Sequence, residues 1–409
     1  MFLDNKFNTQ HSKFNIRTKC DNSKLITFIM HIIQIITELK PAGAERILAN
    51  LSICLKEKGC DVTVISLKTL PENRAIVDEL FSFNIPILSL NLTKLKPWKM
   101  LKLNKLISKI SHEPRTTNHQ SFSTQNLKLK TNIIIHSHLM HANLICRLNK
   151  KMGGKFKLLN TIHIAEKRKN RSWYFMLDKL AINQSDHINA VSKAARNYHS
   201  SKLNIDHGKI SIVYNGIKTP KQLNKDEIVH LKKEWGMNEC SKIIGSVGRL
   251  DWQKGYDIFL KLLPKLSKNI PKDETWGVVI LGEGYQRNLL EKFAGKAPGN
   301  IKVTLPGYRK DASDCISAFD LFVMPSRYEG FGLTLIEAVS QGVPIVASNE
   351  DSLPELMYNY VNGICVSNDD QTEIIKLILK YINKSRIAPS NNFTIEKMTE
   401  EYLKIYKKL

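Results

Sequence analysis

Short apolar runs alternate along the chain with longer stretches in which apolar and polar residues repeat at helical spacing. Helical patterns run, for example, from Glu45 to Lys58 and from Asp257 to Lys268. This alternation predicts parallel sheets with helices on both faces, an α/β fold that binds ligands at the carboxyl ends of its strands. The runs with the length and branched aliphatic content of buried strands are 26–35, 62–67, 85–90, 133–136, 157–162, 187–191, 210–214, 242–248, 276–281, 301–305, 320–324, 344–347 and 363–366.

The length of 409 residues suits two domains. A boundary is indicated after Asn215-Gly216, because 217–240 is charged and lacks a clear strand pattern. We therefore expect an N-terminal extension, a first domain, a second domain and a C-terminal segment. Their expected bounds are 1–24, 25–218, 219–390 and 391–409.

Two further segments stand out from this pattern. The stretch 111–132 is polar and rich in Ser, Thr, Asn and Gln, which is typical of a flexible insertion loop. The segment from Phe393 to Leu409 reads as an amphipathic helix. Its apolar side would carry Ile395, Met398, Tyr402 and Ile405.

The composition indicates a basic surface and a cytoplasmic location. The net charge is +23, which favours anionic partners: a phosphorylated substrate, an anionic membrane or nucleic acid. The seven cysteines form no C-x-x-C pair and show no metal-binding spacing, which indicates reduced thiols in a cytoplasmic protein. We find no secretory signal pattern, and the apolar run 25–39 is shorter than the roughly 20 residues that span a bilayer.

The strongest chemical motif covers residues 325–338, Pro-Ser-Arg-Tyr-Glu-Gly-Phe-Gly-Leu-Thr-Leu-Ile-Glu-Ala. It follows an apolar strand and opens a helix, so its glycines allow close backbone approach and its N–H groups suit a diphosphate. Glu329 precedes the helix and Glu337 lies within its first two turns. The two carboxylates can address different parts of one ligand, although an ordinary strand-turn-helix is the alternative.

A second motif, Gly248-Arg249-Leu250-Asp251-Trp252-Gln253-Lys254-Gly255, also follows a strand. Arg249 and Lys254 can neutralise the charge of a departing diphosphate without a metal. The alternative is a pair of surface cations on a loop.

Weaker candidates lie in the first half of the chain. Gly43 and Glu45 stand at a helix start in Leu-Lys-Pro-Ala-Gly-Ala-Glu-Arg. His136, His138 and His163 come at strand ends, where a histidine can bond a substrate hydroxyl. Taken singly, each histidine fits a structural role better.

Together these segments resemble the retaining glycosyltransferases of the GT-B fold, group 1 or family 4, over roughly 25–409 apart from the insertion. Glu329 and Glu337 match the family's E-x7-E motif, and Arg249 with Lys254 matches its phosphate-clamping pair. Ala42 departs from the paired glycines of the N-terminal loop. The remaining matches are Gly43 and Glu45 in that loop, Asn215-Gly216 at the end of the first domain, and the donor-side turns Gly282-Glu283-Gly284 and Pro306-Gly307.

The resemblance implies two Rossmann-like domains facing each other across a cleft, with the last helix returning to the first domain. It implies that Arg249 and Lys254 hold the donor diphosphate, that Glu337 binds the ribose and that Glu329 contacts the transferred sugar. The N–H groups of Gly332 and Leu333 would touch phosphate, and His163 would lie near the sugar. Gly43, Gly282 and Arg309 are further donor-side candidates, and His138 and Glu45 are acceptor-side candidates.

The same resemblance implies transfer with retained anomeric configuration and without a cofactor. No metal is expected, and the chain contains no D-x-D triplet. A UDP-sugar is favoured as donor because it is frequent in the family, and GDP is the alternative.

The kind of acceptor we expect depends on how the basic surface is interpreted. The stretch Lys94 to Ile110 places Trp98, Leu101, Ile107 and Ile110 on one side among lysines, and the basic loop Lys167 to Arg171 can join it. If this side lies on the inner face of the cytoplasmic membrane, the acceptor is a lipid-linked glycan of polysaccharide or lipopolysaccharide assembly. The alternative is a helix packed on its own sheet.

Two other functions remain open from the sequence. One is a non-catalytic basic protein that binds membrane or nucleic acid, although no nucleic-acid motif supports it. The other is a sugar-nucleotide epimerase of the same fold.

Overall fold

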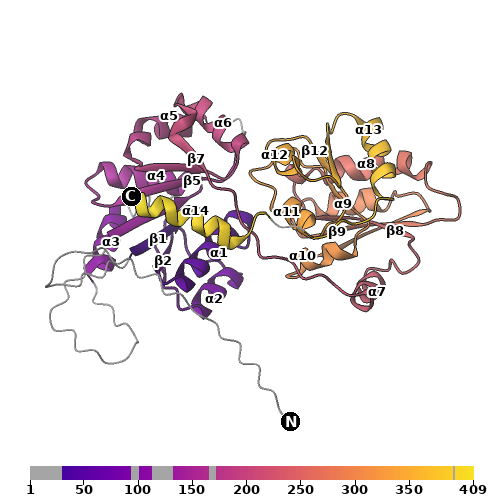
Figure 1. The fold of residues 1–409 in the computed structure, drawn as a ribbon, viewed down its shortest axis with the longest axis horizontal. Helices are drawn as coiled ribbons and strands as arrows, with labels where there is room; N and C mark the ends of the chain where they lie inside the picture. The colour runs from indigo at the N-terminus through magenta and orange to yellow at the C-terminus, as the bar shows by residue number, and fades with distance from the viewer. Residues whose placement is uncertain (1–29, 94–100, 113–131, 165–171, 390–391) are drawn as a thin grey trace, which may run out of the picture. The chain divides into compact units, whose positions relative to one another are not determined.

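The computed structural model describes residues 30–93, 101–112, 132–164, 172–389 and 392–409. The expected N-terminal extension, Trp98, most of the polar insertion and the loop Lys167 to Arg171 lie outside these residues. Figure 1 shows the fold, which contains two sheets with helices around each.

The first sheet has seven strands in the order β3-β2-β1-β4-β5-β6-β7. The pairings from β3 through β5 are parallel, and Ile33 of β1 lies between Thr63 and Ile135. The strand order reverses at β1 and β4, as in doubly wound sheets. The strands are β1 (Met30–Ile36), β2 (Asp61–Ser66), β3 (Ile87–Ser89), β4 (Asn132–His138), β5 (Lys157–Ile162), β6 (His187–Ala190) and β7 (Ile210–Ile212).

The second sheet has six parallel strands in the order β10-β9-β8-β11-β12-β13. Its order reverses between β8 and β11, so the loops that follow these two strands emerge side by side at one edge. Each run predicted as a strand contains a strand in the structure, with small shifts at the ends, and 26–29 of the first run lie outside the described residues. The strands are β8 (Lys242–Val247), β9 (Trp276–Leu281), β10 (Ile301–Gly307), β11 (Leu321–Met324), β12 (Ile345–Ser348) and β13 (Gly363–Val366).

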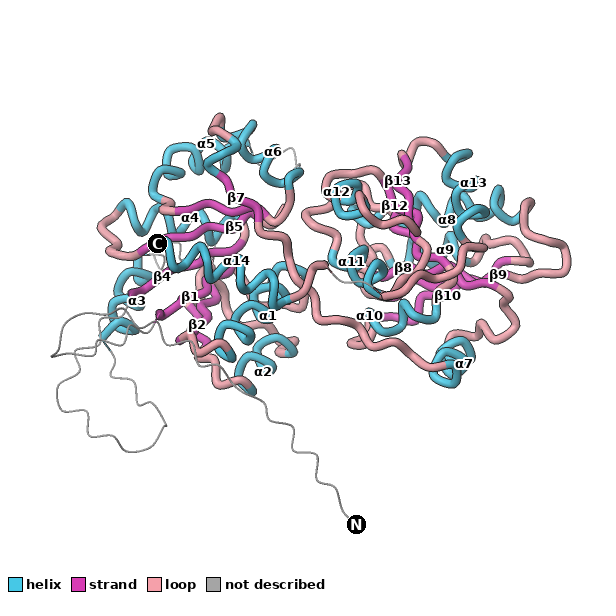
Figure 2. Tube along the Cα trace, viewed as in Figure 1, coloured by secondary structure: helices cyan, strands magenta, loops and turns pink. Residues whose placement is uncertain are grey.

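Helices flank both sheets, as the cyan segments of Figure 2 show. Neighbouring residues of the second sheet's strands enter two separate apolar clusters: Ile243 and Phe322 join one, and Ile244 and Val323 join the other. Because successive side chains of a strand point to opposite faces, this sheet is buried on both sides. The α-helices are α1 (Gly43–Glu57), α2 (Ala75–Ser82), α3 (Lys102–His112), α4 (Met140–Lys151), α5 (Ser172–Ala181), α6 (Lys193–Leu203), α7 (Lys225–Glu234), α8 (Tyr256–Ser267), α9 (Arg287–Ala294), α10 (Ala312–Cys315), α11 (Leu333–Ser340), α12 (Leu353–Met357), α13 (Gln371–Tyr381) and α14 (Ile395–Lys408).

The chain divides into two compact units. The first unit contains residues up to Thr161, Trp173–Ile188 and Thr399–Leu409, and the second unit contains Ile162–Ser172 and Asn189–Met398. The expected domain boundary at 218 stays a prediction.

Helix α3 corrects the expected membrane-facing side. Ile107 and Ile110 are buried with Leu103 against Ile33 and Ile135 of the first sheet, whereas Leu101 is exposed. Periodicity alone marks an apolar side of a helix without saying whether it faces a sheet or a membrane, and here it faces the sheet. Among the described residues, no helix is both long and apolar enough to cross a membrane.

Candidate active site

The two strongest motifs meet at the edge where the second sheet reverses its order. The loop after β8 contains the 3-10 helix η5 (Trp252–Lys254), and the loop after β11 leads into α11. The Nζ of Lys254 lies 2.6 Å from Oε1 of Glu329, and both side chains are largely buried. The Ser326 hydroxyl donates to the same carboxylate oxygen over 2.7 Å. A cation and a carboxylate predicted from separate motifs are therefore in direct contact.

Backbone contacts hold these two loops together. The Arg327 N–H donates to the carbonyl of Gln253 over 2.7 Å, and the Gln253 side-chain amide donates to the carbonyl of Tyr328 over 3.0 Å. Gly255 has a positive φ of 67°, and a Cβ placed there would lie 2.0 Å from the carbonyl oxygen of Pro325. Glycine is required at this position because no side chain fits between the loops.

Arg327 and Asp257 reinforce the same loops, although their pairing is not visible in the sequence. Two guanidinium nitrogens of Arg327 each donate to Asp257 over 2.8 Å, and the guanidinium carbon lies 4.7 Å from the ring centre of Trp252. Burial acts to raise the pKa of Asp257, but the hydrogen bonds and charge of Arg327 outweigh it and hold that pKa below its ordinary value. Paired carboxylate and guanidinium groups fix the base of the loop.

The start of α11 is open to a ligand. Gly332 at the N-cap has a φ of 82° and no side chain caps the helix, which leaves the N–H groups of its first turn without a side-chain acceptor. The hydroxyl oxygen of Thr334 is buried and has no hydrogen-bond partner among the described residues. The helix dipole, N–H groups without a side-chain cap and an unsatisfied hydroxyl together suit an anion.

Glu337 lies one turn further along α11. Burial raises the pKa of Glu337 to about 7, and the charge of Lys254 acts to lower it. Near neutral pH this carboxyl group is therefore divided between its protonated and ionised forms. A ligand that donates hydrogen bonds to it would favour the ionised form.

Arg249 is the exposed member of the cationic pair. Its side chain is 62% exposed and its guanidinium lies 3.1 Å from Asp251. Gly282, at the neighbouring end of β9, supports this loop: a Cβ there would lie 2.0 Å from the carbonyl oxygen of Gly248, and its N–H donates to Gly307. Arg249 is thus presented to solvent from a closely packed loop.

His163 belongs to the second unit and packs beside the E-x7-E segment. A Cβ added at Gly330 would lie 2.1 Å from the His163 carbonyl oxygen, and the Ser192 hydroxyl donates to the Gly330 carbonyl over 3.0 Å. Burial lowers the pKa of His163 to about 4, so its imidazole is neutral at pH 7.

Three other residues predicted at the site have contacts or positions of their own, and their roles there stay predictions. Arg309 is engaged by Glu234 at 2.5 Å and Asp311 at 2.9 Å, and these carboxylates raise its pKa. Gly43 and Glu45 lie in the first turn of α1 in the first unit, where Gly43 is exposed and Glu45 is buried.

His138 is fully buried in the first unit. Its Nε2 lies 2.6 Å from Oε1 of Gln34, and its ring contacts that of His136 in a tilted arrangement, with 4.1 Å between ring centres. The two nitrogens of His136 lie 2.7 Å from the hydroxyls of Tyr406 and Thr161. Tyr406 of α14, the yellow helix in Figure 1, therefore closes this cluster. The structure thus gives His138 structural partners and no exposed surface.

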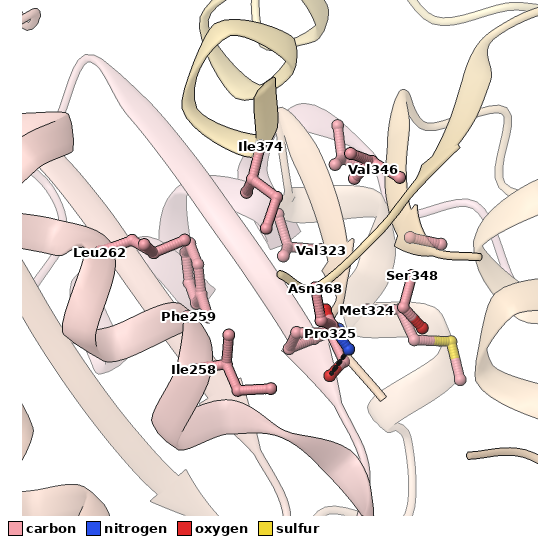
Figure 3. A pocket seen from close by; sticks show the side chains of 12 residues that line it. Ile258, Phe259, Leu262, Val323, Met324, Pro325, Val346, Ser348, Asn368 and Ile374 are labelled. Carbon is pink, nitrogen blue, oxygen red and sulfur yellow. Dashed lines mark hydrogen bonds between the residues drawn. The ribbon is translucent and has the colours of Figure 1, made fainter. Parts of the chain in front are cut away.

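An apolar hollow lies behind the β11 loop, as Figure 3 shows. Side chains of α8, β11 and β12 line it, including Phe259, Val323 and Val346. The Asn368 amide donates to the carbonyls of Pro325 and Ser326 over 3.2 and 3.1 Å. The side chains that line the hollow lie on the core side of the loop. None of the charged residues of the two motifs is among them.

Comparison with known protein families shows to which family the chain belongs. The family model described as Glycosyltransferase Family 4 matches residues 41–221, and the model described as Glycosyl transferases group 1 matches residues 228–398. The chain belongs to the group 1 glycosyltransferases. The predicted membership of this family is therefore confirmed.

Relatives of this glycosyltransferase are identical to it at about a quarter of the aligned positions. It is 27% identical to the lipopolysaccharide core biosynthesis mannosyltransferase LpsB of Rhizobium meliloti over 273 residues, which are 62% of this chain and 74% of LpsB. It is 24% identical to an Escherichia coli UDP-Gal:alpha-D-GlcNAc-diphosphoundecaprenol alpha-1,3-galactosyltransferase over 352 residues, 83% of this chain and 84% of the relative.

The fold of the glycosyltransferase also has solved counterparts. HepE of Anabaena, in a crystal structure with UDP, superposes with a TM-score of 0.73 at 17% identity, covering 92% of this chain and all of HepE. The predicted GT-B fold is confirmed.

Proposed function

We propose that this glycosyltransferase is a retaining hexosyltransferase that moves a sugar from a UDP-sugar to a lipid-linked glycan during assembly of a surface polysaccharide or lipopolysaccharide. The contact between Lys254 and Glu329 carries the proposal, because it places a cation and a carboxylate at the strand edge where ligands of this fold class bind.

The donor diphosphate would lie between Arg249, Lys254 and the open start of α11. As the bond to the sugar breaks, negative charge grows on the leaving phosphate oxygen. Two fixed cations and the N–H groups of Gly332 and Leu333 would stabilise that charge. The proposed reaction requires no metal ion and no cofactor.

The two carboxylates would take different parts of the donor. Glu337 would accept hydrogen bonds from the ribose hydroxyls, which favours its ionised form. When Lys254 turns to the phosphate, Glu329 would accept hydrogen bonds from the transferred sugar. His163, neutral at pH 7, would act as a hydrogen-bond partner of the sugar and not as a cation.

The ligands and substrates of related proteins support the proposed donor and acceptor. HepE has been crystallised with UDP and with UDP-glucose. The Escherichia coli relative uses UDP-Gal and a diphosphoundecaprenol-linked acceptor, and LpsB acts in lipopolysaccharide core biosynthesis. We extend these features to the present chain, with the enzyme in the cytoplasm at the inner face of the membrane.

Calorimetric titration with UDP, GDP and ADP tests the donor site. We expect UDP to bind most tightly, and Arg249→Ala to weaken that binding about tenfold or more, since a hydrogen bond to a charged group is lost. Lys261→Ala, which removes an exposed cation of α8, is the matched control. The proposal fails if none of the nucleotides binds, or if both variants bind UDP as the wild type does.

A further inference from the structure

Helix α5 presents a stripe of large apolar side chains to solvent. Trp173, Met176, Leu177 and Leu180 are 52%, 62%, 36% and 70% exposed. The last three lie three, four and seven positions after Trp173, a spacing that puts all four on one side of the helix. We refer to these four residues as the α5 stripe.

The opposite side of α5 is firmly attached to the first unit. Tyr174 is buried against Leu144 and Ala181, and its hydroxyl donates to the carbonyl of Met140. Asp178 forms a buried ion pair with Arg147 of α4. The stripe is therefore the outward side of an anchored helix, so its exposure is a property of the folded unit.

The charges on the stripe's side of α5 and just before it in the sequence are mainly positive. Asp178 is the only acidic residue of α5 and it is turned inward, whereas Lys179 is exposed. In the sequence, 165–171 immediately precedes the helix and contains four basic residues against one acidic residue. An apolar side next to an exposed lysine, in a helix preceded by a basic stretch of sequence, complements a surface that is apolar inside and anionic at its boundary.

We infer that the α5 stripe docks this enzyme on an anionic lipid bilayer, with Trp173 at the level of the headgroups. The inference rests on the lipid-linked acceptor of the proposed function and names the surface that would bring the enzyme to it. A second copy of the chain fits less well. A ten-residue helix offers a face of roughly 15 by 10 Å, far below the ~800 Å² that each partner of a stable interface buries.

Vesicle co-sedimentation tests the inference without requiring transfer activity. The probes are vesicles of phosphatidylcholine with one quarter phosphatidylglycerol, and vesicles of phosphatidylcholine alone. We expect stronger binding to the anionic vesicles, and a loss of at least tenfold in Met176→Ser/Leu180→Ser. Val229→Ser/Val361→Ser, which changes two exposed apolar residues of the second unit, should bind as the wild type does.

A charge variant separates the two contributions. Lys179→Gln should weaken binding to the anionic vesicles about fivefold and leave binding to neutral vesicles unchanged. Equal binding of wild type to both vesicles, or equal binding of the stripe and control variants, overturns the inference. Self-association in sedimentation velocity that is lost only in the stripe variant also overturns it and assigns the stripe to a second copy.

Titration of the stripe variant with UDP keeps the two proposals distinct. Unchanged UDP affinity with lost vesicle binding supports both. In the wild type, vesicle binding without any nucleotide binding supports the docking surface while the proposed function fails.

Discussion

The two units bury their polar side chains in different places. In the first unit they lie throughout the sheet and the helices on it. In the second unit the charged ones, Asp251, Asp257 and Glu329, lie in the loops after β8 and β11 or in the first turn of α8. The buried polar residues of the first unit's strands and of α4 and α5 include His31, Gln34, Thr63, Ser66, His136, Ser137, His138, Asn143, Arg147, Asn149, Asn160, Thr161 and Asp178.

The difference shows which polar groups serve the fold and which are arranged for a ligand. In the first unit Ser137 donates to Asn143, Asn143 donates to the carbonyl of Thr161, and Arg147 donates to Asn160. Such groups satisfy one another and are costly only when a partner is removed. In the second unit Arg249, Glu337 and Thr334 keep bonding capacity that the protein itself does not use.

The largest effect is expected inside the first unit. Arg147→Met should lower the free energy of unfolding by about 3–5 kcal/mol, because Asp178 would stay buried without its cation. Urea denaturation measures this change. Arg147→Met/Asp178→Leu should recover most of the loss, since a buried ion pair can be replaced by apolar groups. A single variant as stable as the wild type would show that this ion pair is not structural.

The same substitution in the second unit should leave stability nearly intact and remove activity. Arg249→Met changes a side chain that is largely exposed, so the free energy of unfolding should change by less than about 1 kcal/mol. Release of UDP from a UDP-sugar should slow about 100- to 1000-fold, because leaving-group stabilisation is lost. Lys261→Met is the control. If Arg249→Met unfolded at a much lower urea concentration and kept normal turnover, Arg249 would serve the fold and not the ligand.

A smaller effect, in the dependence on pH, is expected at Glu337. If ribose hydroxyls bind its ionised form, the affinity for UDP should rise as the pH increases through about 7, by up to tenfold per unit below that value. In Glu337→Gln this contribution should vanish. The UDP phosphate, with a pKa of roughly 6, titrates in the same way with both proteins, so its effect cancels in the ratio of their UDP affinities. Parallel pH profiles of the two proteins would exclude Glu337 from the nucleotide site.

The stability of the free enzyme should respond to Glu337 in the opposite sense. Its pKa is higher in the folded state than its ordinary value, so the folded protein keeps a proton that the unfolded chain has released. The contribution of this group to stability therefore falls as the pH rises from about 4.5 towards 7.

Much of the fold was predictable because its strands are short apolar runs bounded by polar turns. The contact between the two loops also had a sequence basis: each motif follows a strand, and β8 and β11 are neighbours in the sheet. Ser326 could have been found from its position three residues before Glu329.

The rest depends on partners that are distant in the sequence. Gln34 and Tyr406, which complete the cluster of His136 and His138, come from opposite ends of the described chain. Arg309 is held by Glu234, and local spacing does not indicate that pairing. The same limit applies to α3 and α5, because an apolar side is visible in both sequences and only the fold shows which one is covered.

The contact of Tyr406 with His136 also has a consequence for synthesis on the ribosome. The two residues are 270 positions apart, so at roughly 5–20 residues per second Tyr406 is made about 15–50 s after His136. Throughout that interval the nascent first unit lacks the hydroxyls of Tyr402 and Tyr406 that belong in its interior. Its sheet has to wait for the last helix of the described chain, and a ribosome that stalls before that helix would release a product with an open core, suited to capture by chaperones or proteases.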